Sequence, residues 1–193
     1  MKLSLILPIL FTITFACSLT SGQIGFHREQ LTVSVSGESC SLDADYYFKN
    51  SAFRPAGCSI FYPLINRKGL PLPDSILVLA DSKGTPIGFE KTSEGILFYL
   101  DLKSEEARKI RGRYRQRTPL HKFEYILTST KAWGKPLEFA EFCIVVPDSF
   151  QLTSCSPSYD TNEKIEHAMV YHITRQHFMP TSNLIVQWKR RTQ

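Results

Sequence analysis

The residues whose spacing could do chemistry begin with a row of cations in the second half of the chain. One lysine and four arginines occupy every second position: Lys109, Arg111, Arg113, Arg115 and Arg117. Alternate residues of a β-strand point to the same side, so neighbouring cations of this row would lie roughly 6.5–7 Å apart on one face. Arginine favours paired hydrogen bonds to carboxylates, phosphates and sulfates. The row therefore predicts either an anion-binding face or a solvated face whose charges pair with acids such as Glu124.

The cysteines are the second informative set. Five are present, and one of them, Cys17, lies in the N-terminal segment. The other four are Cys40, Cys58, Cys143 and Cys155. Four cysteines allow three disulfide connectivities. We favour Cys40–Cys58 and Cys143–Cys155. Each pair flanks a short strand–turn–strand excursion, and each bond would stabilise the fold by roughly 2–4 kcal/mol. No C-x-x-C occurs, which disfavours zinc binding and thioredoxin-type redox chemistry.

Histidines and acids in this sequence indicate no metal site. The histidines at 167, 172 and 177 are five residues apart, a spacing that aligns them on one face of neither a strand nor a helix. Asp43 and Asp45 share a strand face, but a calcium loop would need more residues and a glycine. The motifs G-x-S-x-G and H-E-x-x-H and a glycine-rich phosphate loop do not occur. We predict no metal, no cofactor and no catalytic residue, although a triad assembled from distant strands stays open.

The elements that position these residues are expected to be β-strands. Gln30–Ser36 and Leu42–Lys49 alternate apolar and polar residues, as half-buried strands do. Three successive strands are expected over Lys109–Arg117, Lys122–Thr130 and Leu137–Val146. In all, about ten short strands are separated by turn signals. The sequence therefore predicts an all-β fold, a single two-sheet antiparallel β-sandwich of immunoglobulin-like or jelly-roll-like type.

The N-terminal segment has the features of a leader. A positive start is followed by Leu3–Phe15, an apolar stretch too short to span a bilayer, and then by small residues. We expect a signal peptide over residues 1–22, cleaved after Gly22. The alternative is a lipoprotein signal in which Cys17 is acylated. Removal of the leader leaves 193 − 22 = 171 residues, 23–193, which suffice for one β-sandwich domain.

Charge and compartment narrow the range of partners. The formal net charge is +5, and removal of a leader with one lysine and no acid lowers it to +4. So mild a balance does not predict nucleic acid as a partner, and no stacking platform shares the cationic face. No transmembrane helix is expected in the mature chain. We expect a protein that is secreted, periplasmic or held at the outer cell envelope, with another protein, an anionic glycan or a lipid headgroup as its partner.

Several segments together carry a resemblance to a known group. They are Asp45–Ser51, Tyr62–Leu64, Tyr125–Thr130 and Trp133–Leu137. They resemble uncharacterised secreted β-sandwich domains found mainly in bacteria. The likeness covers most of Leu31–Pro147 and implies the fold, without transferring a catalytic residue. Within it, Trp133 would either close one end of the sandwich or present a stacking surface for a sugar.

Three functions are compatible with these features. The first is a non-enzymatic binding or interaction module, secreted or envelope-associated, because a complete β scaffold occurs without a catalytic motif. The second is a protein that binds an acidic glycan or another polyanion through the arginine-rich strand. The third is a hydrolase whose site is assembled from dispersed histidines and carboxylates.

Overall fold

The computed structural model describes residues 23–192, which form β-strands and one short 3₁₀ helix. The strands are β1 (Ile24–Ser36), β2 (Ser39–Asn50), β3 (Ala56–Pro63), β4 (Ser75–Asp81), β5 (Phe89–Lys91), β6 (Gly95–Leu102), β7 (Ala107–Arg117), β8 (Lys122–Tyr125), β9 (Leu137–Pro147), β10 (Phe150–Ser156), β11 (Thr161–Ile165), β12 (Ala168–Phe178) and β13 (Leu184–Arg190). The helix η1 spans Thr128–Trp133. The predicted all-β class is confirmed.

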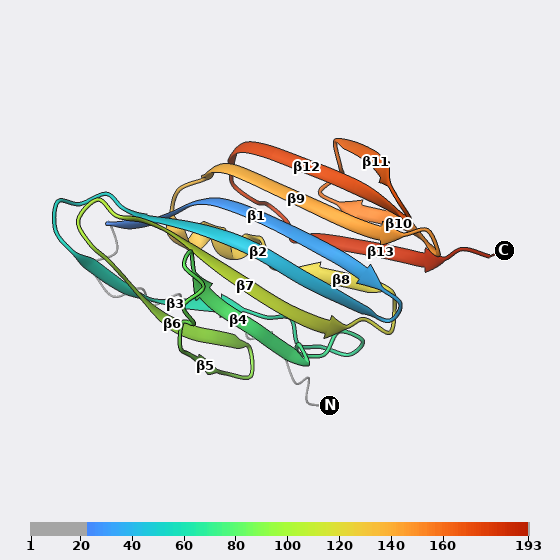
Figure 1. The fold of residues 1–193 in the computed structure, drawn as a ribbon, viewed down its shortest axis with the longest axis horizontal. Coiled ribbons are helices and arrows are strands. Elements are labelled where there is room, and N and C mark those ends of the chain that lie inside the picture. Colours follow the sequence, from blue (N-terminus) through green and yellow to red (C-terminus); the bar gives the residue numbers. More distant parts are fainter. Residues whose placement is uncertain (1–22, 193) are drawn as a thin grey trace, which may run out of the picture.

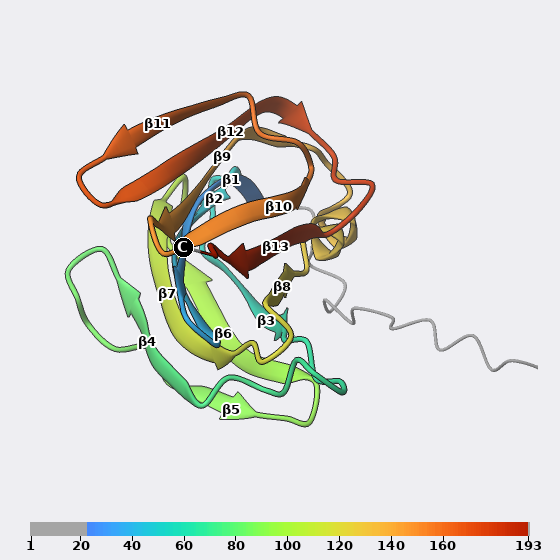
Figure 2. The same cartoon turned by 90° about the vertical axis from the view of Figure 1, so that its right-hand side faces the viewer.

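The strands form three sheets. The large sheet has seven strands in the order β11-β12-β9-β1-β2-β7-β4, in which β1 and β9 pair in parallel and the other neighbours pair antiparallel (Figure 1). Two smaller sheets have the orders β10-β13-β8 and β3-β6-β5. Figure 2 shows the large sheet curving around both smaller ones, which lie against its concave face.

The expected single two-sheet sandwich of about ten strands is therefore corrected. The described residues contain thirteen strands in three sheets. Strand length gives the physical reason. β1 has 13 residues and β2 has 12, whereas the strands of the two small sheets have at most 8. At roughly 3.3 Å per residue, one short sheet cannot cover the inner face of the long strands, and two sheets divide it between them.

The three successive strands expected from Lys109 to Val146 are not neighbours in space. β7 lies between β2 and β4, β8 forms an edge of the second sheet, and β9 lies between β12 and β1. The expected strand over Lys122–Thr130 ends at Tyr125, and the chain turns into η1. Gly134 closes that helix in the left-handed region at φ 70°, where its N–H donates to the carbonyl of Lys131 at 3.0 Å.

Period-two alternation decides which side chains enter the core. On β1 and β2 the buried side chains include those of Leu31, Val33, Leu42 and Ala44, while their sequence neighbours face outward. Residues from the facing sheets complete one continuous cluster, including Phe123 of β8 and Leu100 of β6. The alternation that predicted half-buried strands is thus realised in both elements.

The structure does not form the two disulfides that we expected. Cys40, Cys143 and Cys155 are free thiols. Cys40 is buried on the inner face of β2, in a different sheet from Cys58 on β3. On β9, Phe142 and Ile144 are buried on the inner face, so Cys143 between them faces outward. Cys155 belongs to β10 in the facing sheet, which places it on the other side of β9 from the Cys143 thiol.

Two further expectations concern the ends and the membrane. The leader over residues 1–22, its cleavage after Gly22 and the acylation of Cys17 all fall outside the described residues. Within residues 23–192, no helix is long and apolar enough to cross a bilayer. That finding agrees with the expectation of no transmembrane helix in this part of the chain.

Thiol chemistry tests this arrangement. We expect Cys40, Cys143 and Cys155 to be alkylated by iodoacetamide in urea without any reductant, because none is held in a disulfide. In the native protein Cys40 should stay unmodified, since burial raises its pKa to about 12 and removes it from solvent. Peptide mass spectrometry measures both. Alkylation in urea that appears only after reduction would show that the predicted disulfides exist after all.

Candidate functional site

A glutamate lies among the apolar side chains of the large sheet. Glu29 of β1 is 1% exposed and shares the inner face with Leu31 and Val33, which lie two and four residues further along the same strand. A β-bulge between Phe26 and Arg28 shifts the alternation, so that Phe26 also points inward three residues before Glu29. The bulge therefore brings an aromatic ring and a carboxyl to the same interior region.

Three tyrosines connect to this carboxyl in a hydrogen-bonded row. The hydroxyl of Tyr125 on β8 donates to Oε1 of Glu29 at 2.5 Å. It lies 3.2 Å from the hydroxyl of Tyr46 on β2, which lies 2.7 Å from that of Tyr62 on β3. Gly112 on β7 leaves room for the row, because a Cβ there would approach Cε2 of Tyr46 to 3.0 Å. All three sheets thus contribute to one polar network inside the core.

Burial sets the charge state of the network. Desolvation raises the pKa of Glu29 to about 7, and the hydrogen bond from Tyr125 opposes this rise. Desolvation likewise raises the pKa values of Tyr46, Tyr62 and Tyr125 well above their ordinary value, and the nearby Glu29 adds to the rise. The tyrosines therefore stay neutral hydrogen-bond donors, while Glu29 changes charge near neutral pH.

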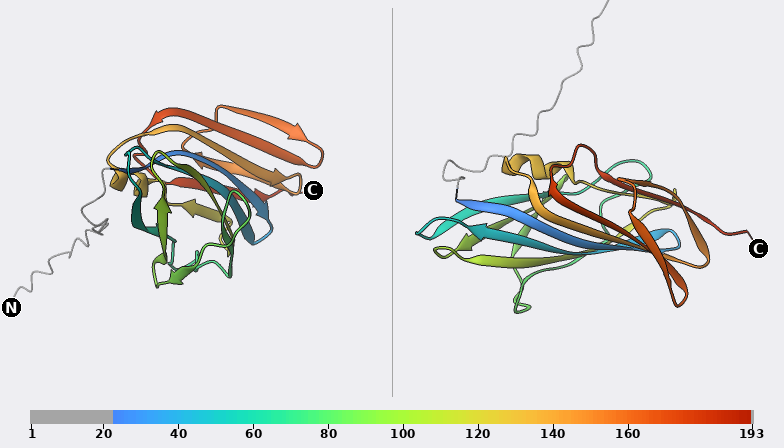
Figure 3. Two further views of the ribbon diagram at one scale, coloured as in Figure 1. Left: turned by 60° about the vertical axis from the view of Figure 1, so that its left-hand side comes forward. Right: turned by 90° about the horizontal axis from the view of Figure 1, so that it is seen from above.

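The network borders a small cavity between the large sheet, β3 and η1. Its volume is about 50 Å³, and more than half of the residues that line it are aromatic. Glu29 and Tyr125 lie in its wall, while the partly exposed Tyr62, Ser129 and Trp133 lie where it meets the surface. Figure 3 shows η1 beside the end of the large sheet at which β1 begins. The cavity therefore opens at one end of the sandwich.

Trp133 of η1 packs against the core beside the opening of the cavity. Its ring centroid lies 6.1 Å from that of Phe26 and 5.5 Å from that of Phe48, and all three rings line the cavity. Tyr159 packs against Tyr171, with their ring centroids 4.9 Å apart, and does not share a stacking surface with Trp133. The rings around Trp133 form an aromatic wall inside the cavity.

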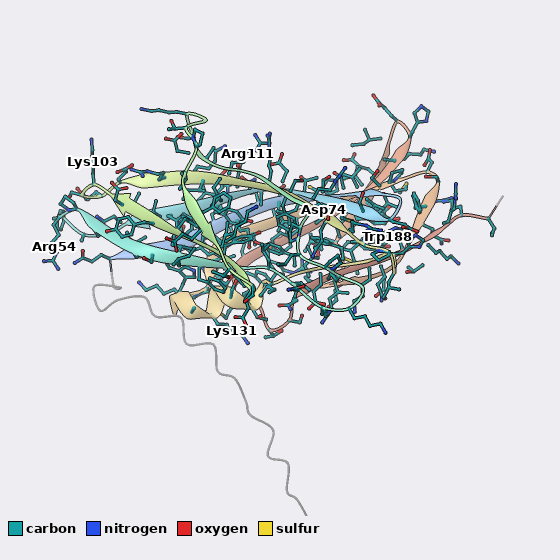
Figure 4. The ribbon with its side chains drawn as sticks, turned by 90° about the horizontal axis from the view of Figure 1, so that it is seen from below. Arg54, Asp74, Lys103, Arg111, Lys131 and Trp188 are labelled. Carbon is teal, nitrogen blue, oxygen red and sulfur yellow. The ribbon has the colours of Figure 1, made fainter. Side chains whose placement is uncertain are left out.

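The cationic row lies on the opposite, outer face of the large sheet. Figure 4 shows Arg111 rising on the other side of the molecule from Lys131 of η1. We had expected the row to pair with acids such as Glu124. Its partners are instead the two aspartates of β2, Asp43 and Asp45. Asp43 accepts from Nε and Nη2 of Arg111 at 2.7 and 2.6 Å and from Nε of Arg113 at 3.0 Å. These hydrogen bonds, those from Arg111 first, lower the pKa of Asp43.

The remaining members of the row differ in their surroundings. Lys109 pairs with Asp45 at 3.1 Å, so the two aspartates weighed as calcium ligands are engaged by cations. Glu124 is buried, accepts from Asn183 at 2.9 Å and pairs with Arg67. Within residues 23–192, the side chains of Arg115 and Arg117 form no ion pair. A hollow of about 440 Å³ lies beside the paired cations, between Lys109, Arg111 and Arg113 and the segment that follows β4.

The structure brings together one row of residues that could in principle act as a nucleophile, a base and an acid. Sγ of Cys143 lies 3.5 Å from Nδ1 of His172, and Nε2 of His172 lies 3.1 Å from Oε1 of Glu163. The row crosses β9, β12 and β11 on the outer face. His167 and His177 are exposed and lie outside it. Sequence reasoning missed the row because cross-strand register, not chain spacing, creates it.

This row lacks two features of a catalytic centre. Burial, with Glu141 and Glu163 next, raises the pKa of Cys143, whereas a reactive cysteine needs a lowered pKa. Cys143 lies in mid-sheet between Thr32 and His172, so neighbouring backbone N–H groups take part in the ladder and are not aimed at an oxyanion.

Within residues 23–192, no cluster of three metal-binding side chains is found.

Glu29 is the residue of this site that sequence reasoning missed, and a signal for it existed. The alternation of Leu31, Val33 and Val35 extends backwards to position 29, which places a glutamate in line with three buried residues. The predicted strand began at Gln30 and so stopped one residue short. The contribution of Tyr125 required the tertiary structure, because β8 belongs to a different sheet.

The raised pKa of Glu29 predicts a stability profile. Folded Glu29 has a pKa of about 7 against an ordinary 4.5, so the folded state holds more protons than the unfolded state between these values. The free energy of unfolding should therefore fall as pH rises through this window, by on the order of 3 kcal/mol. Glu29→Gln should lose this dependence and exceed the wild type in stability at pH 8. Urea unfolding at pH 4.5 and pH 8 measures it.

The exposed Glu90→Gln serves as the matched control for the same chemical change. It should follow the wild-type profile at both pH values. Parallel profiles for wild type and Glu29→Gln would show that Glu29 does not titrate inside the core.

Solved structures of other proteins share the fold of this chain. No family model matches the chain, and no curated protein matches it. Among solved structures, a "putative nutrient binding protein" from Legionella pneumophila is similar, with a TM-score of 0.67 and 12% identity over 86% of this chain and 67% of that one. An M1 zinc metallopeptidase from Deinococcus radiodurans is also similar, with a TM-score of 0.57 and 15% identity over 86% of this chain and 42% of that one.

These similarities are at the level of the fold. The chain spans about two thirds of the first structure and about two fifths of the second. Identities of 12% and 15% carry no site residue across. They agree with the fold-level part of the resemblance noted from the sequence. The described chain is an all-β domain of the same fold as part of these two bacterial proteins.

Proposed function

We propose that this chain is a non-enzymatic binding module, secreted or associated with the cell envelope, and that its ligand enters the aromatic cavity beside Glu29. The observation that carries the proposal is the cavity itself: an interior space with aromatic walls, one carboxyl and an opening at the end of the sandwich. Binding sites typically combine apolar and aromatic walls with a few placed polar groups.

The chemistry around the cavity supports binding over turnover. Among the residues that the structure describes, no histidine lines the cavity, and the hydroxyl of Ser129 donates to the carbonyl of Ile126 at 3.1 Å. A hydroxyl held in this way, without a neighbouring histidine, has no base to activate it in the manner of a triad. The carboxyl of Glu29 is bound to Tyr125. These groups can hold and orient a ligand.

Two further points agree with the proposal. The leader-like character of residues 1–22 supports a location outside the cytoplasm. One of the structures that share the fold is described as a nutrient binding protein, and this likeness rests on the fold. A binding module of the cell exterior is compatible with both.

A pair of variants tests whether the cavity is the ligand site. Ser129→Phe places a ring at the opening, where Ser129 is partly exposed, whereas Ser41→Phe makes the same change on the exposed outer face of β2. A ligand-observed NMR screen would use small amines, acids, alcohols and sugars. We expect at least one class to bind the wild type and Ser41→Phe with a dissociation constant of roughly millimolar or lower, and to bind Ser129→Phe about tenfold more weakly. Absence of any binder, or equal binding by both variants, would reject the site.

A second candidate function, polyanion binding through the outer face, rests on Arg115 and Arg117. They are exposed and form no ion pair within residues 23–192, whereas Lys109, Arg111 and Arg113 are already paired with aspartates. The cations of β7 that are available to an anionic glycan or a lipid headgroup therefore lie at the end of this strand, near Arg117. Of the four arginines predicted to form the anion-binding face, Arg111 to Arg117, the proposal therefore uses Arg115 and Arg117.

Charge reversal tests the second candidate. Arg115→Glu with Arg117→Glu should elute from a heparin matrix at lower salt than Lys131→Glu with Lys135→Glu. The control makes the same change in net charge on exposed residues at η1. Equal shifts for the two double variants would show that retention follows net charge alone and would reject the outer face as a site.

A further inference from the structure

We infer that the aromatic cavity accepts a small organic cation, an alkylammonium or methylated ammonium group, held between the carboxylate of Glu29 and the surrounding ring faces. The inference rests on the proposed function and names the ligand class of that same site. It follows from the charge, the rings and the size of the cavity.

The charge argument begins with a missing partner. Glu29 is 1% exposed, and within residues 23–192 no lysine, arginine or histidine pairs with it or lines the cavity. Its hydrogen bond comes from the neutral hydroxyl of Tyr125. A buried carboxylate is costly unless an opposite charge accompanies it. A cationic ligand would supply that charge, whereas an anionic ligand would meet a like charge in the wall.

The rings supply the second part of the site. Phe26, Phe48 and Trp133 lie within 5.2–6.1 Å of one another, measured between centroids, and line the cavity together. Tyr46 of β2 and Tyr62 of β3 also line the cavity, with their own centroids 5.6 Å apart. The face of an aromatic ring attracts a cation, and the attraction is strongest where water is excluded. Aromatic rings and one carboxyl that line the same cavity are the combination that retains an ammonium group.

The size of the cavity limits what can enter. Its 50 Å³ would hold roughly three to five waters, since one water needs about 10–15 Å³ on this measure. A drug-sized ligand needs several hundred Å³ and would not be enclosed. One ammonium head group is of suitable size, and the partly exposed Tyr62, Ser129 and Trp133 leave a path for the remainder of a longer molecule.

The ionisable groups that face the cavity are Glu29, Tyr46, Tyr62 and Tyr125, and Tyr114 lies behind them. The pKa values of the four tyrosines are all raised well above 10. Glu29 is therefore the group that changes charge at neutral pH. Cation binding should strengthen as pH rises from 6 to 8. Below pH 7 it should release up to one proton from Glu29.

The test compares a cation with its neutral isostere. Choline and 3,3-dimethylbutan-1-ol share a shape and differ in the charged nitrogen. Isothermal titration at pH 8 should give choline an affinity about tenfold or more above that of the alcohol. At pH 6.5, titration in buffers of different ionisation enthalpy should detect proton release with choline and none with the alcohol.

Two variants separate the contributions of charge and rings. Glu29→Gln should lose the preference for choline and the proton release, while Glu90→Gln, an exposed control, should retain both. Trp133→Leu keeps an apolar wall but removes a ring face, so it should weaken choline severalfold and leave the alcohol nearly unchanged. Circular dichroism and thermal unfolding check that each variant is folded. If Glu29→Gln does not fold, the effect of Trp133→Leu on choline binding tests the inference.

The outcomes distinguish this inference from the proposed function. If choline and methylammonium bind no better than the alcohol, while some small ligand still binds and is lost in Ser129→Phe, the cavity is a ligand site of another chemistry and the cation inference falls. If choline binds but Glu29→Gln and Trp133→Leu leave it unchanged, the cation lies elsewhere and the inference also falls. If no small molecule depends on Ser129, the proposed function fails as well.

Discussion

The constraint on which the structure depends is the covering of one long apolar sheet face. The inner face of β1, β2, β7 and β9 extends beyond what one short sheet can cover, and leaving it exposed would forfeit the largest favourable term in folding. Two separate small sheets cover it, one at each end. The division has a consequence at the boundary: where β3 and β8 come close, their side chains do not fill the space completely, and the cavity lies there.

The cavity combines features that a purely structural core would avoid. Glu29 and three tyrosine hydroxyls occupy a region where apolar side chains would pack without any cost of desolvation. The hydrogen bond from Tyr125 favours the ionised carboxyl and so opposes the rise of its pKa, but a neutral hydroxyl supplies no opposite charge. The same low polarity that raises the pKa of Glu29 would strengthen its attraction for a cation. Stability and binding therefore draw on one physical property, the exclusion of water from the carboxyl.

The outer face of the large sheet follows a different logic. Its cations are conspicuous in the sequence, yet β2 places Asp43 and Asp45 opposite them, and the resulting exposed ion pairs contribute little to stability. The same face carries the row of Cys143, His172 and Glu163, whose spacing resembles a catalytic arrangement. Because burial raises the pKa of the Cys143 thiol, proximity to His172 alone gives the row no catalytic advantage. The cations that stand out in the sequence are thus partly paired with aspartates in the structure. Glu29, which does not stand out in the sequence, lines the cavity.

Sequence alone determined the all-β class, the alternation of β1 and β2 and the common face of the cationic row, because each depends on neighbours along a single strand. Only the tertiary structure decided the number of sheets, the partners of the cations and the separation of the cysteines. The strand at β9 is nearly all apolar, so its sequence could not show that Cys143 faces outward. The site around Glu29 also required the tertiary structure, because its hydrogen-bonding partners come from three sheets and meet only when the long sheet face is covered.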